Sequence, residues 1–517
     1  MGLRIEDRPS KGTLRVTRIL DRFQSALFSP QARTAVLAHA LLIGAGALVA
    51  ALLVAAGGPL YGSAAFLVLV FGVLILRDIR WGFLAVFAVI GFLPFATLPF
   101  KIGFTPTFLN VAVLAVYFVW IMRVATRRDR ELLASPIGAA VLLFLLVAVF
   151  AFANGLRFSR PTMTTIRNFA ELVLAIGFFF ILVNTLRTQR DTELVARLIM
   201  LAGAAGAAIA VVFYVIPDTT TIRILNALGR FGYPGGAGAL RYIEDDSANP
   251  MRAIGTMVDP NVLGGFLILM IGLTVPQLVS PAPLFRRSLV ASFLAVEMLA
   301  LYLTYSRGSL VGLAVGLLVI GVLRYRKLLP LALVGGLLLL LLPQTQAYVA
   351  RFIEGIQLQD RATLMRLGEY KDALALIRRY PWFGVGFAGS PDADLYVGVS
   401  NLYLLMGEIM GVLGVLAFLI VITGYLANLW TAWRRLLTCR ALQRSEGSQC
   451  PARFDDTRQE ALLLGLAAAI TGALAGGIFD HYLFNLVYPH MSVLLWTYLG
   501  LGMAVVALSR PQSSGNL

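Results

Sequence analysis

Charged side chains are scarce in this chain. They make up 14% of its 517 residues, whereas hydrophobic residues make up 59%. A soluble domain of this length would carry many more charges, so the composition excludes that class. Apolar runs of about 20 residues recur from end to end, which is the length that a helix needs to cross a bilayer. Because these runs are continuous rather than alternating, they also exclude a membrane barrel.

Residues that commonly hold metals and cofactors are also rare. The chain has three histidines and two cysteines, and the pair Cys439 and Cys450 predicts neither a disulfide framework nor a metal site. It contains no Walker loop, no zinc-protease pattern and no dinucleotide fingerprint. The sequence therefore predicts no metal and no cofactor.

The apolar runs predict an all-α polytopic integral membrane protein with about 12–14 transmembrane helices. The candidate spans are 36–56, 60–76, 81–98, 108–122, 137–152, 169–186, 194–215, 262–279, 289–303, 310–323, 328–342, 402–429, 461–479 and 491–508. We expect a basic N-terminus over 1–35, a single transmembrane domain over 36–510, and a short tail over 511–517.

Basic residues alternate from loop to loop. They gather before residue 35 and near 77–80, 127–130, 187–190, 286–287, 324–327 and 434–444. The positive-inside rule places all of these loops in the cytoplasm, together with both termini. A net charge of +16 would indicate nucleic acid in a soluble protein, but here this rule accounts for it, so no nucleic-acid partner is expected.

The opposite, extracytoplasmic face carries two long loops, 217–261 and 343–401. Long loops of this kind are usually functional or disordered. The second loop contains an apolar pattern at helical spacing from Asp360 to Tyr380, which predicts an amphipathic helix on the membrane surface that ends at Pro381. A shorter outer loop, 154–167, carries three arginines against the positive-inside rule, and this exception requires a cause.

Three outward-facing arginines are the main candidates for function. Arg307 lies between two apolar runs, where a charge is costly and usually functional. Arg252 and Arg366 lie in the two long outer loops. Guanidinium groups bind phosphate oxygens through paired hydrogen bonds, so the three together could hold a diphosphate. The alternative is that they anchor the loops to lipid headgroups.

Candidate proton acceptors are few. His481 follows Asp480 in the last outer turn, and a histidine beside a carboxylate is a plausible general base, although an ordinary interfacial histidine is an equally good interpretation. Glu408 lies about two turns below the second long loop, near enough to matter to a bound lipid head.

Four stretches resemble the O-antigen ligase and polymerase superfamily of bacterial membrane glycosyltransferases. Together they cover about residues 250–425, and their order and spacing are more specific than any one of them. They are Arg252 with Gly255-Thr256 and Asp259-Pro260-Asn261, then Thr304-Tyr305-Ser306-Arg307-Gly308, then Arg366 through Pro381, Gly384 and Gly386, and finally Asn401-Leu402-Tyr403-Leu404 with Glu408.

The resemblance implies a GT-C-like fold in the bacterial inner membrane with an active site that faces the periplasm. It implies a metal-independent, inverting transfer of glycan from a polyprenyl-diphosphate-linked oligosaccharide, such as one on undecaprenyl diphosphate, to a glycan or lipid acceptor. Membrane lipid is then a further partner. Arg252, Arg307 and Arg366 would hold the diphosphate.

One position departs from the pattern. Ligases have a histidine directly before the Asn-x-Tyr-Leu run, where this chain has Ser400, a poor base near neutral pH. Asn401 and Tyr403 remain candidates for acceptor contact beside Ser400. The serine slightly favours a polymerase over a ligase, and we expect His481, Glu408 or an acid of the pair Asp392 and Asp394 to act as the base.

Two alternatives from other classes stay open. A transporter, either a lipid-oligosaccharide flippase or an anion carrier, would also have many spans, but it should line a midplane cavity with ionisable groups. Here the arginines fall in outer loops, which favours chemistry at one face. A non-catalytic scaffold is the third interpretation, and the retained Arg307 argues against it.

Overall fold

The computed structural model describes residues 72–98, 103–126, 132–327, 329–330, 361–389, 397–446 and 456–509, with a few single residues elsewhere. The chain divides into two compact units, Met1–Trp81 and Gly82–Leu517. The expected cytoplasmic N-terminus, the tail over 511–517 and the spans predicted at 36–56, 60–76 and 328–342 fall wholly or largely outside the described residues. These domain boundaries therefore stay predictions.

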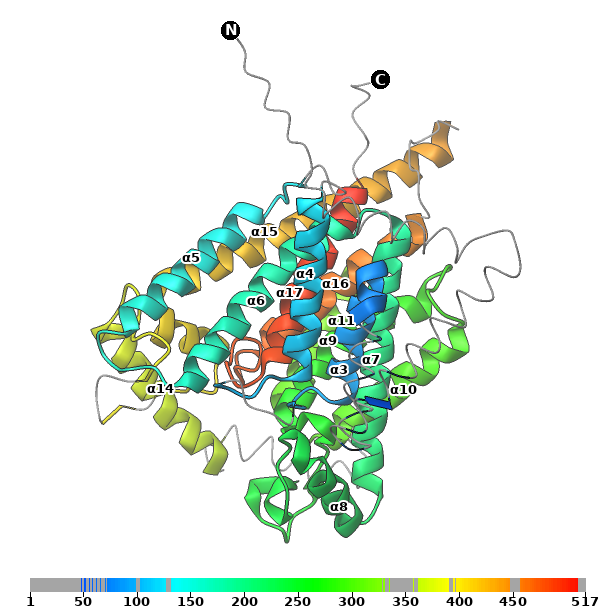
Figure 1. The fold of residues 1–517 in the computed structure, drawn as a ribbon. Coiled ribbons are helices and arrows are strands. Elements are labelled where there is room, and N and C mark those ends of the chain that lie inside the picture. Colours follow the sequence, from blue (N-terminus) through cyan, green and yellow to red (C-terminus); the bar gives the residue numbers. More distant parts are fainter. Residues whose placement is uncertain are drawn as a thin grey trace. The chain divides into compact units, whose positions relative to one another are not determined.

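The described part of the chain is almost entirely helical (Figure 1). Its helices are α3 (Arg80–Phe92), α4 (Phe108–Ala125), α5 (Gly138–Gly155), α6 (Met163–Thr185), α7 (Gln189–Val215), α8 (Asp218–Leu228), α9 (Pro260–Val279), α10 (Arg287–Leu303), α11 (Arg307–Leu323), α14 (Arg361–Arg379), α15 (Leu402–Glu446), α16 (Asp456–Gly476) and α17 (Pro489–Leu508). Between α8 and α9 lie the short turns η1 (Gly229–Phe231), η2 (Ala237–Ala239), η3 (Ile243–Asp245) and η4 (Gly255–Met257), and the strands β1 (Arg241–Tyr242) and β2 (Met251–Arg252).

The predicted class is confirmed. Among the described residues, eight helices are long and apolar enough to cross a membrane, and α3 and α11 are shorter apolar helices. Every predicted span outside the regions named above coincides with one of the described helices. The protein is an all-α polytopic membrane protein.

Two helices form the centre of the bundle. In α17 and α9, 89% and 83% of the apolar window is buried, against 33% in α4 and α5. α9 packs against α16, α10, α11 and α7, whereas α17 packs against α6. Small residues bring α11 and α16 close together, since a Cβ at Gly312 would lie 2.7 Å from the Gly472 carbonyl oxygen. Such contacts are typical of helix packing in lipid, where close van der Waals contact replaces the hydrophobic effect.

α15 is broken, although the sequence predicts an unbroken span over 402–429. Gly411 has φ +68° and ψ −172°, so the helix stops and restarts there. The backbone of the loop after α14 restores the lost hydrogen bonds. Val385 N–H donates to the Glu408 carbonyl at 2.8 Å, and Gly386 N–H donates to the Ile409 carbonyl at 3.0 Å. Backbone groups at membrane depth must be paired within the protein, and this loop pairs them.

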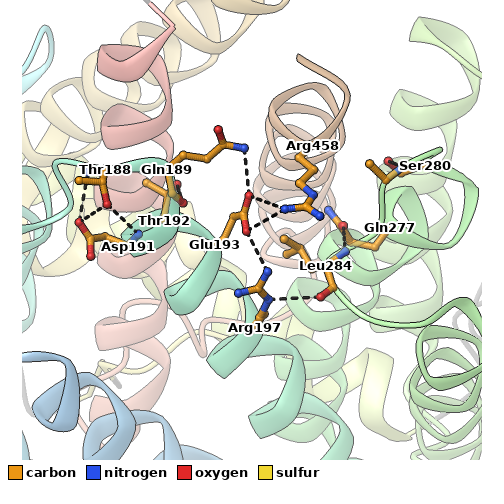
Figure 2. A network of polar contacts seen from close by, with 11 residues as sticks. Thr188, Gln189, Asp191, Thr192, Glu193, Arg197, Gln277, Ser280, Leu284 and Arg458 are labelled. Atoms are coloured by element: carbon orange, nitrogen blue, oxygen red, sulfur yellow. Dashed lines mark hydrogen bonds and ion pairs between the residues drawn. The ribbon is translucent and has the colours of Figure 1, made fainter. Parts of the chain in front are cut away.

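Polar contacts join the helices at one end of the bundle (Figure 2). The Glu193 carboxylate on α7 accepts hydrogen bonds from Arg197 at 2.8 Å and from Arg458 of α16 at 3.2 Å. Glu460, two residues further along α16, pairs with Arg324 and Arg440. Apart from Arg197, which lies at the start of the predicted span 194–215, these residues belong to segments predicted to be cytoplasmic. The fold therefore brings together helix ends that the charge pattern assigns to one face. Cys439, next to Arg440, is disulfide-bonded, a pairing that the sequence did not predict.

Candidate functional site

The long loop predicted at 217–261 is folded over a small core of its own. α8, the short turns and the β1–β2 hairpin surround a set of buried apolar residues: Ala96, Phe213, Leu225, Tyr233, Ala239, Leu240 and Ile254. The two strands pair antiparallel, with Arg241 opposite Arg252. This core fixes the loop against the ends of α7 and α9, so the residues it carries have defined positions.

The three candidate arginines line one cavity. Its volume is about 170 Å³, and Arg252, Arg307 and Arg366 reach it from β2, the start of α11 and α14. The other lining residues come from the hairpin turn, the start of α9, the turns around α11 and the end of α16: Ile243, Glu244, Asn261, Tyr305, Ser306, Gly308, Ser309, Gly476, Phe479, Asp480 and Tyr482. The structure thus brings together side chains that lie more than 100 residues apart in the sequence.

Arg252 is held by two neighbours. Its Nε donates to the Thr304 carbonyl at 2.8 Å, and its Nη2 donates to Asn261 Oδ1 at 2.8 Å. Asp259 caps α9, because its Oδ1 accepts from the backbone N–H groups of Asn261 and Val262. Asp259 is thus the N-cap of α9, and Asn261, which the sequence singled out only as part of a motif, orients the arginine.

Arg307 is the first residue of α11, and Ser306 is its N-cap residue. The first N–H groups of a helix have no partner within it and carry a partial positive charge, so this end favours an anion. Gly308 and Ser309 of the same first turn line the cavity with Arg307. Arg307 therefore presents its side chain where the helix itself already attracts negative charge.

Arg366 is placed by the docking of α14 on α15. The face of α14 that carries Arg366 also buries Ala373, two turns further on, and Tyr370, one turn after Arg366, donates to the Ile478 carbonyl at 3.3 Å. Glu369 accepts from the Ser400 backbone N–H at 2.9 Å. The predicted helix and its end before Pro381 are confirmed, whereas its position on a membrane surface stays a prediction.

Strained backbone surrounds this cavity. Among the described residues, three that are not glycine have positive φ: Glu244 at 60°, Val258 at 65° and Tyr305 at 53°. Glu244 and Tyr305 line the arginine cavity, and Tyr305 lies two residues before Arg307. Such conformations cost about 1–3 kcal/mol each and cluster at functional sites. A sequence gives no sign of them.

The two residues of the predicted acid–base pair touch each other but differ in their access to the cavity. Asp480 lines the cavity with the arginines, whereas His481 is not among its lining residues. The His481 backbone N–H and Nδ1 lie 2.7 and 3.3 Å from Asp480 Oδ1, and Nε2 contacts the Asn485 amide. Of the two residues, only Asp480 lines the cavity, and His481 contacts it from behind; their assignment as an acid–base pair stays a prediction.

Glu408 lies away from the arginine cavity. Its side chain is buried in the first segment of α15, and Oε2 accepts from the Gly398 backbone N–H at 3.3 Å. The carboxylate therefore ties the loop before α15 to the helix. The assignment of Glu408 as a base stays a prediction.

Asn401 and Tyr403 also have structural contacts. Asn401 Oδ1 accepts from the Tyr403 and Leu404 backbone N–H groups and so caps α15, while its amide donates to the Ile478 carbonyl at 2.8 Å. The Tyr403 hydroxyl donates to the Leu474 carbonyl at 3.0 Å. Neither residue lines the arginine cavity, nor does Ser400. Their assignment to the acceptor remains a prediction.

A comparison with protein families gives one match. The model described as O-antigen ligase matches residues 290–419. The match supports the resemblance of this region to the O-antigen ligase and polymerase superfamily. The O-antigen ligase region spans α10, α11, α14 and the first part of α15, so it carries Arg307 and Arg366, while Arg252 and Asp480 lie outside it. No curated protein matches the chain.

Proposed function

We propose that this protein transfers glycan from a polyprenyl-diphosphate carrier to an acceptor hydroxyl at the outer face of the bacterial inner membrane. The observation that carries the proposal is the cavity in which Arg252, Arg307 and Arg366 meet at the first turn of α11. Three guanidinium groups and a helix N-terminus suit two adjacent phosphates, because each guanidinium can pair with two phosphate oxygens. The lipid tail would extend into the bilayer beside the spans.

The proposed step breaks one bond and forms another at the anomeric carbon. The acceptor oxygen attacks from the side opposite the diphosphate, the carbon–oxygen bond to the diphosphate breaks, and the configuration inverts. Asp480 takes the proton of the acceptor hydroxyl, since it is the carboxylate near the start of α11 in the cavity. The arginines stabilise the charge that grows on the departing diphosphate, which is where fixed positive groups accelerate such a reaction. No metal ion is required by this scheme.

We favour a polymerase over a ligase. Ser400 stands where ligases have a histidine, and its backbone N–H is bonded to Glu369 on the helix that carries Arg366. In this chain the proposed base is therefore Asp480, which follows α16, rather than a residue directly before α15. A transporter is the competing function, but the arginine cavity lies where helices begin or end, rather than midway along them.

Gene deletion with complementation tests the proposal. Surface polysaccharide is separated on a gel from the deletion strain, and from strains carrying the wild-type gene or Arg307→Ala. A polymerase predicts single repeat units on surface lipid after deletion, with no rescue by Arg307→Ala at wild-type protein level.

Two other results would change the assignment. Long chains that accumulate on the polyprenyl carrier after deletion would identify a ligase. Full rescue by Arg307→Ala would remove the diphosphate site and favour transport. Arg160→Ala, an exposed arginine outside the cavity, is the matched control and should rescue fully.

A further inference from the structure

A second and larger cavity adjoins the arginine cavity. Its volume is about 420 Å³, and its walls come from the start of α6, the β1 strand and the segment before α17. The two cavities share a wall. Arg241 lines the second and its cross-strand partner Arg252 lines the first, and likewise Asp259 lines the second and Asn261 the first.

Electrostatics also show that the cavities are close together. Burial raises the pKa of Asp259, and the charge of Asp480 raises it further. The pKa of Tyr488, another residue of the second cavity, is raised by burial and then by Asp259 and Asp480. A carboxylate shifts another group in this way only at short range. Asp480, which lines the first cavity, therefore lies near the wall of the second.

A fixed polar network lines one side of the second cavity. Arg167 Nη1 donates to the Thr105 carbonyl at 3.2 Å, Nη2 donates to Asn168 Oδ1 at 2.8 Å, and Nε lies 3.4 Å from Glu171 Oε1. Glu171 also accepts from the Asn110 amide at 2.7 Å. A guanidinium has five N–H donors, so after these contacts each terminal nitrogen of Arg167 keeps one for a ligand.

Aromatic side chains also line this cavity. Phe95 and Tyr488 both line the cavity, and their rings meet edge to face with centroids 6.0 Å apart. A pocket with apolar faces and a few fixed donors and acceptors suits a ligand that has both C–H faces and hydroxyl groups. A sugar ring has both.

The two cavities differ in the balance of positive and negative side chains that line them. Three arginines and two acids, Glu244 and Asp480, line the first, which leaves an excess of positive charge for an anion. Two arginines and two acids line the second. A site with equal formal charges and paired donors and acceptors favours an uncharged polar ligand over a phosphate.

We propose that the second cavity binds the sugar of the acceptor, and that Arg167 with Glu171 holds its hydroxyl groups. This inference rests on the proposed function, because the acceptor must lie beside the donor diphosphate. It also accounts for Arg167 as an exception to the positive-inside rule in the outer loop 154–167: the arginine is retained there to line a binding site.

A binding experiment tests the inference on the full-length protein in lipid nanodiscs. The probe is the free oligosaccharide released by mild acid from the cell's own lipid-linked repeat units, and binding is read by saturation-transfer NMR. Thr164→Trp fills the cavity from an exposed position in the first turn of α6 and leaves the Arg167 network intact. It should abolish the transfer signal. Met163→Trp, next to it but outside the cavity, is the matched control and should keep the signal.

Arg167→Gln should weaken oligosaccharide binding about tenfold, since it removes charge-assisted hydrogen bonds. Arg307→Ala should leave this binding unchanged and instead lose binding of fluorescent undecaprenyl diphosphate, which Thr164→Trp should retain. A saturation-transfer signal that persists in Thr164→Trp, or that is absent from the wild-type protein, overturns the inference. If Arg307→Ala binds undecaprenyl diphosphate as well as wild type does, the proposed donor site is wrong. The inference about the second cavity is then decided separately by the oligosaccharide binding of Thr164→Trp.

Discussion

Two glycine-to-alanine changes on the same segment are expected to have opposite effects. Gly384 has φ +64°, and a Cβ there would lie 2.3 Å from the Glu408 carbonyl oxygen and 2.5 Å from the Ile409 carbonyl carbon. Both atoms belong to the backbone of the broken α15 and cannot move aside cheaply. Gly368 lies within α14, and a Cβ there would meet nothing within 4 Å. Gly384→Ala should therefore destabilise the protein, whereas Gly368→Ala should not.

The size of the effect follows from the contacts. A side chain in the left-handed region costs about 1–2 kcal/mol. Displacement of the loop also breaks the bonds from Val385 and Gly386 to α15, each worth about 0.5–1.5 kcal/mol. Gly384→Ala should thus cost about 2–5 kcal/mol. Gly368→Ala should gain about 0.5–1 kcal/mol, because alanine is the better helix former.

Thermal unfolding of the purified protein in detergent measures both changes. For a chain of this size 1 kcal/mol shifts Tm by about 1 °C, so Gly384→Ala should lower it by about 2–5 °C and Gly368→Ala should raise it slightly. Because the loop also joins α14 to α15, Gly384→Ala should reduce glycan transfer. A Tm for Gly384→Ala equal to or above that of Gly368→Ala would refute the role assigned to the loop.

Three further changes test other contacts. Asn261→Ala removes one of the hydrogen bonds that position Arg252 and keeps the charge of the arginine. It should lower kcat/KM about tenfold with little change in Tm, as loss of a charge-assisted hydrogen bond predicts; an unchanged kcat/KM would contradict the positioning role. Asp259 has a raised pKa, so its proton binds more tightly to the folded state and its contribution to stability falls as pH rises above about 4. Asp259→Asn keeps a helix cap, and its Tm relative to wild type should rise between pH 4 and pH 7; a constant difference would refute the shift. Glu193→Gln removes the carboxylate that two partly exposed arginines share, and should cost about 1–3 kcal/mol by chemical denaturation; unchanged stability would show that the cluster has no structural role.

Much of the fold was predictable because each signal is local. A bilayer requires continuous apolar runs, so the spans from 81 to 508 that fall on described residues coincide with helices. The amphipathic period predicted α14 to within a residue or two, and Pro381 marked its end. The break in α15 was missed because Gly411 looks like one of many small residues in a membrane helix. Only the tertiary contact with Val385 and Gly386 makes that break stable.

Some residues of the candidate site could likewise be predicted from the sequence, and others could not. Arg307 was recognisable from the cost of a charge between apolar runs, and the structure places it with Arg252 and Arg366. Whether Asp480 or His481 faces a cavity depends on a single turn of backbone, which no spacing rule predicts. The contact of Asn261 with Arg252 and the positive φ of Tyr305 were also beyond sequence reasoning, because no sequence pattern specifies a side-chain partner or a strained backbone angle.

The rate of glycan transfer by Arg307→Ala tests the central claim most directly. Lipid-linked repeat units are supplied to the purified protein in liposomes, and kcat/KM is compared with that of wild type and of Arg160→Ala. Loss of a group that stabilises transition-state charge typically costs about 10²–10³-fold, so Arg307→Ala should fall by that factor while Arg160→Ala stays near wild type. A well-folded Arg307→Ala protein that keeps the wild-type rate would contradict the assignment of this cavity to the donor diphosphate.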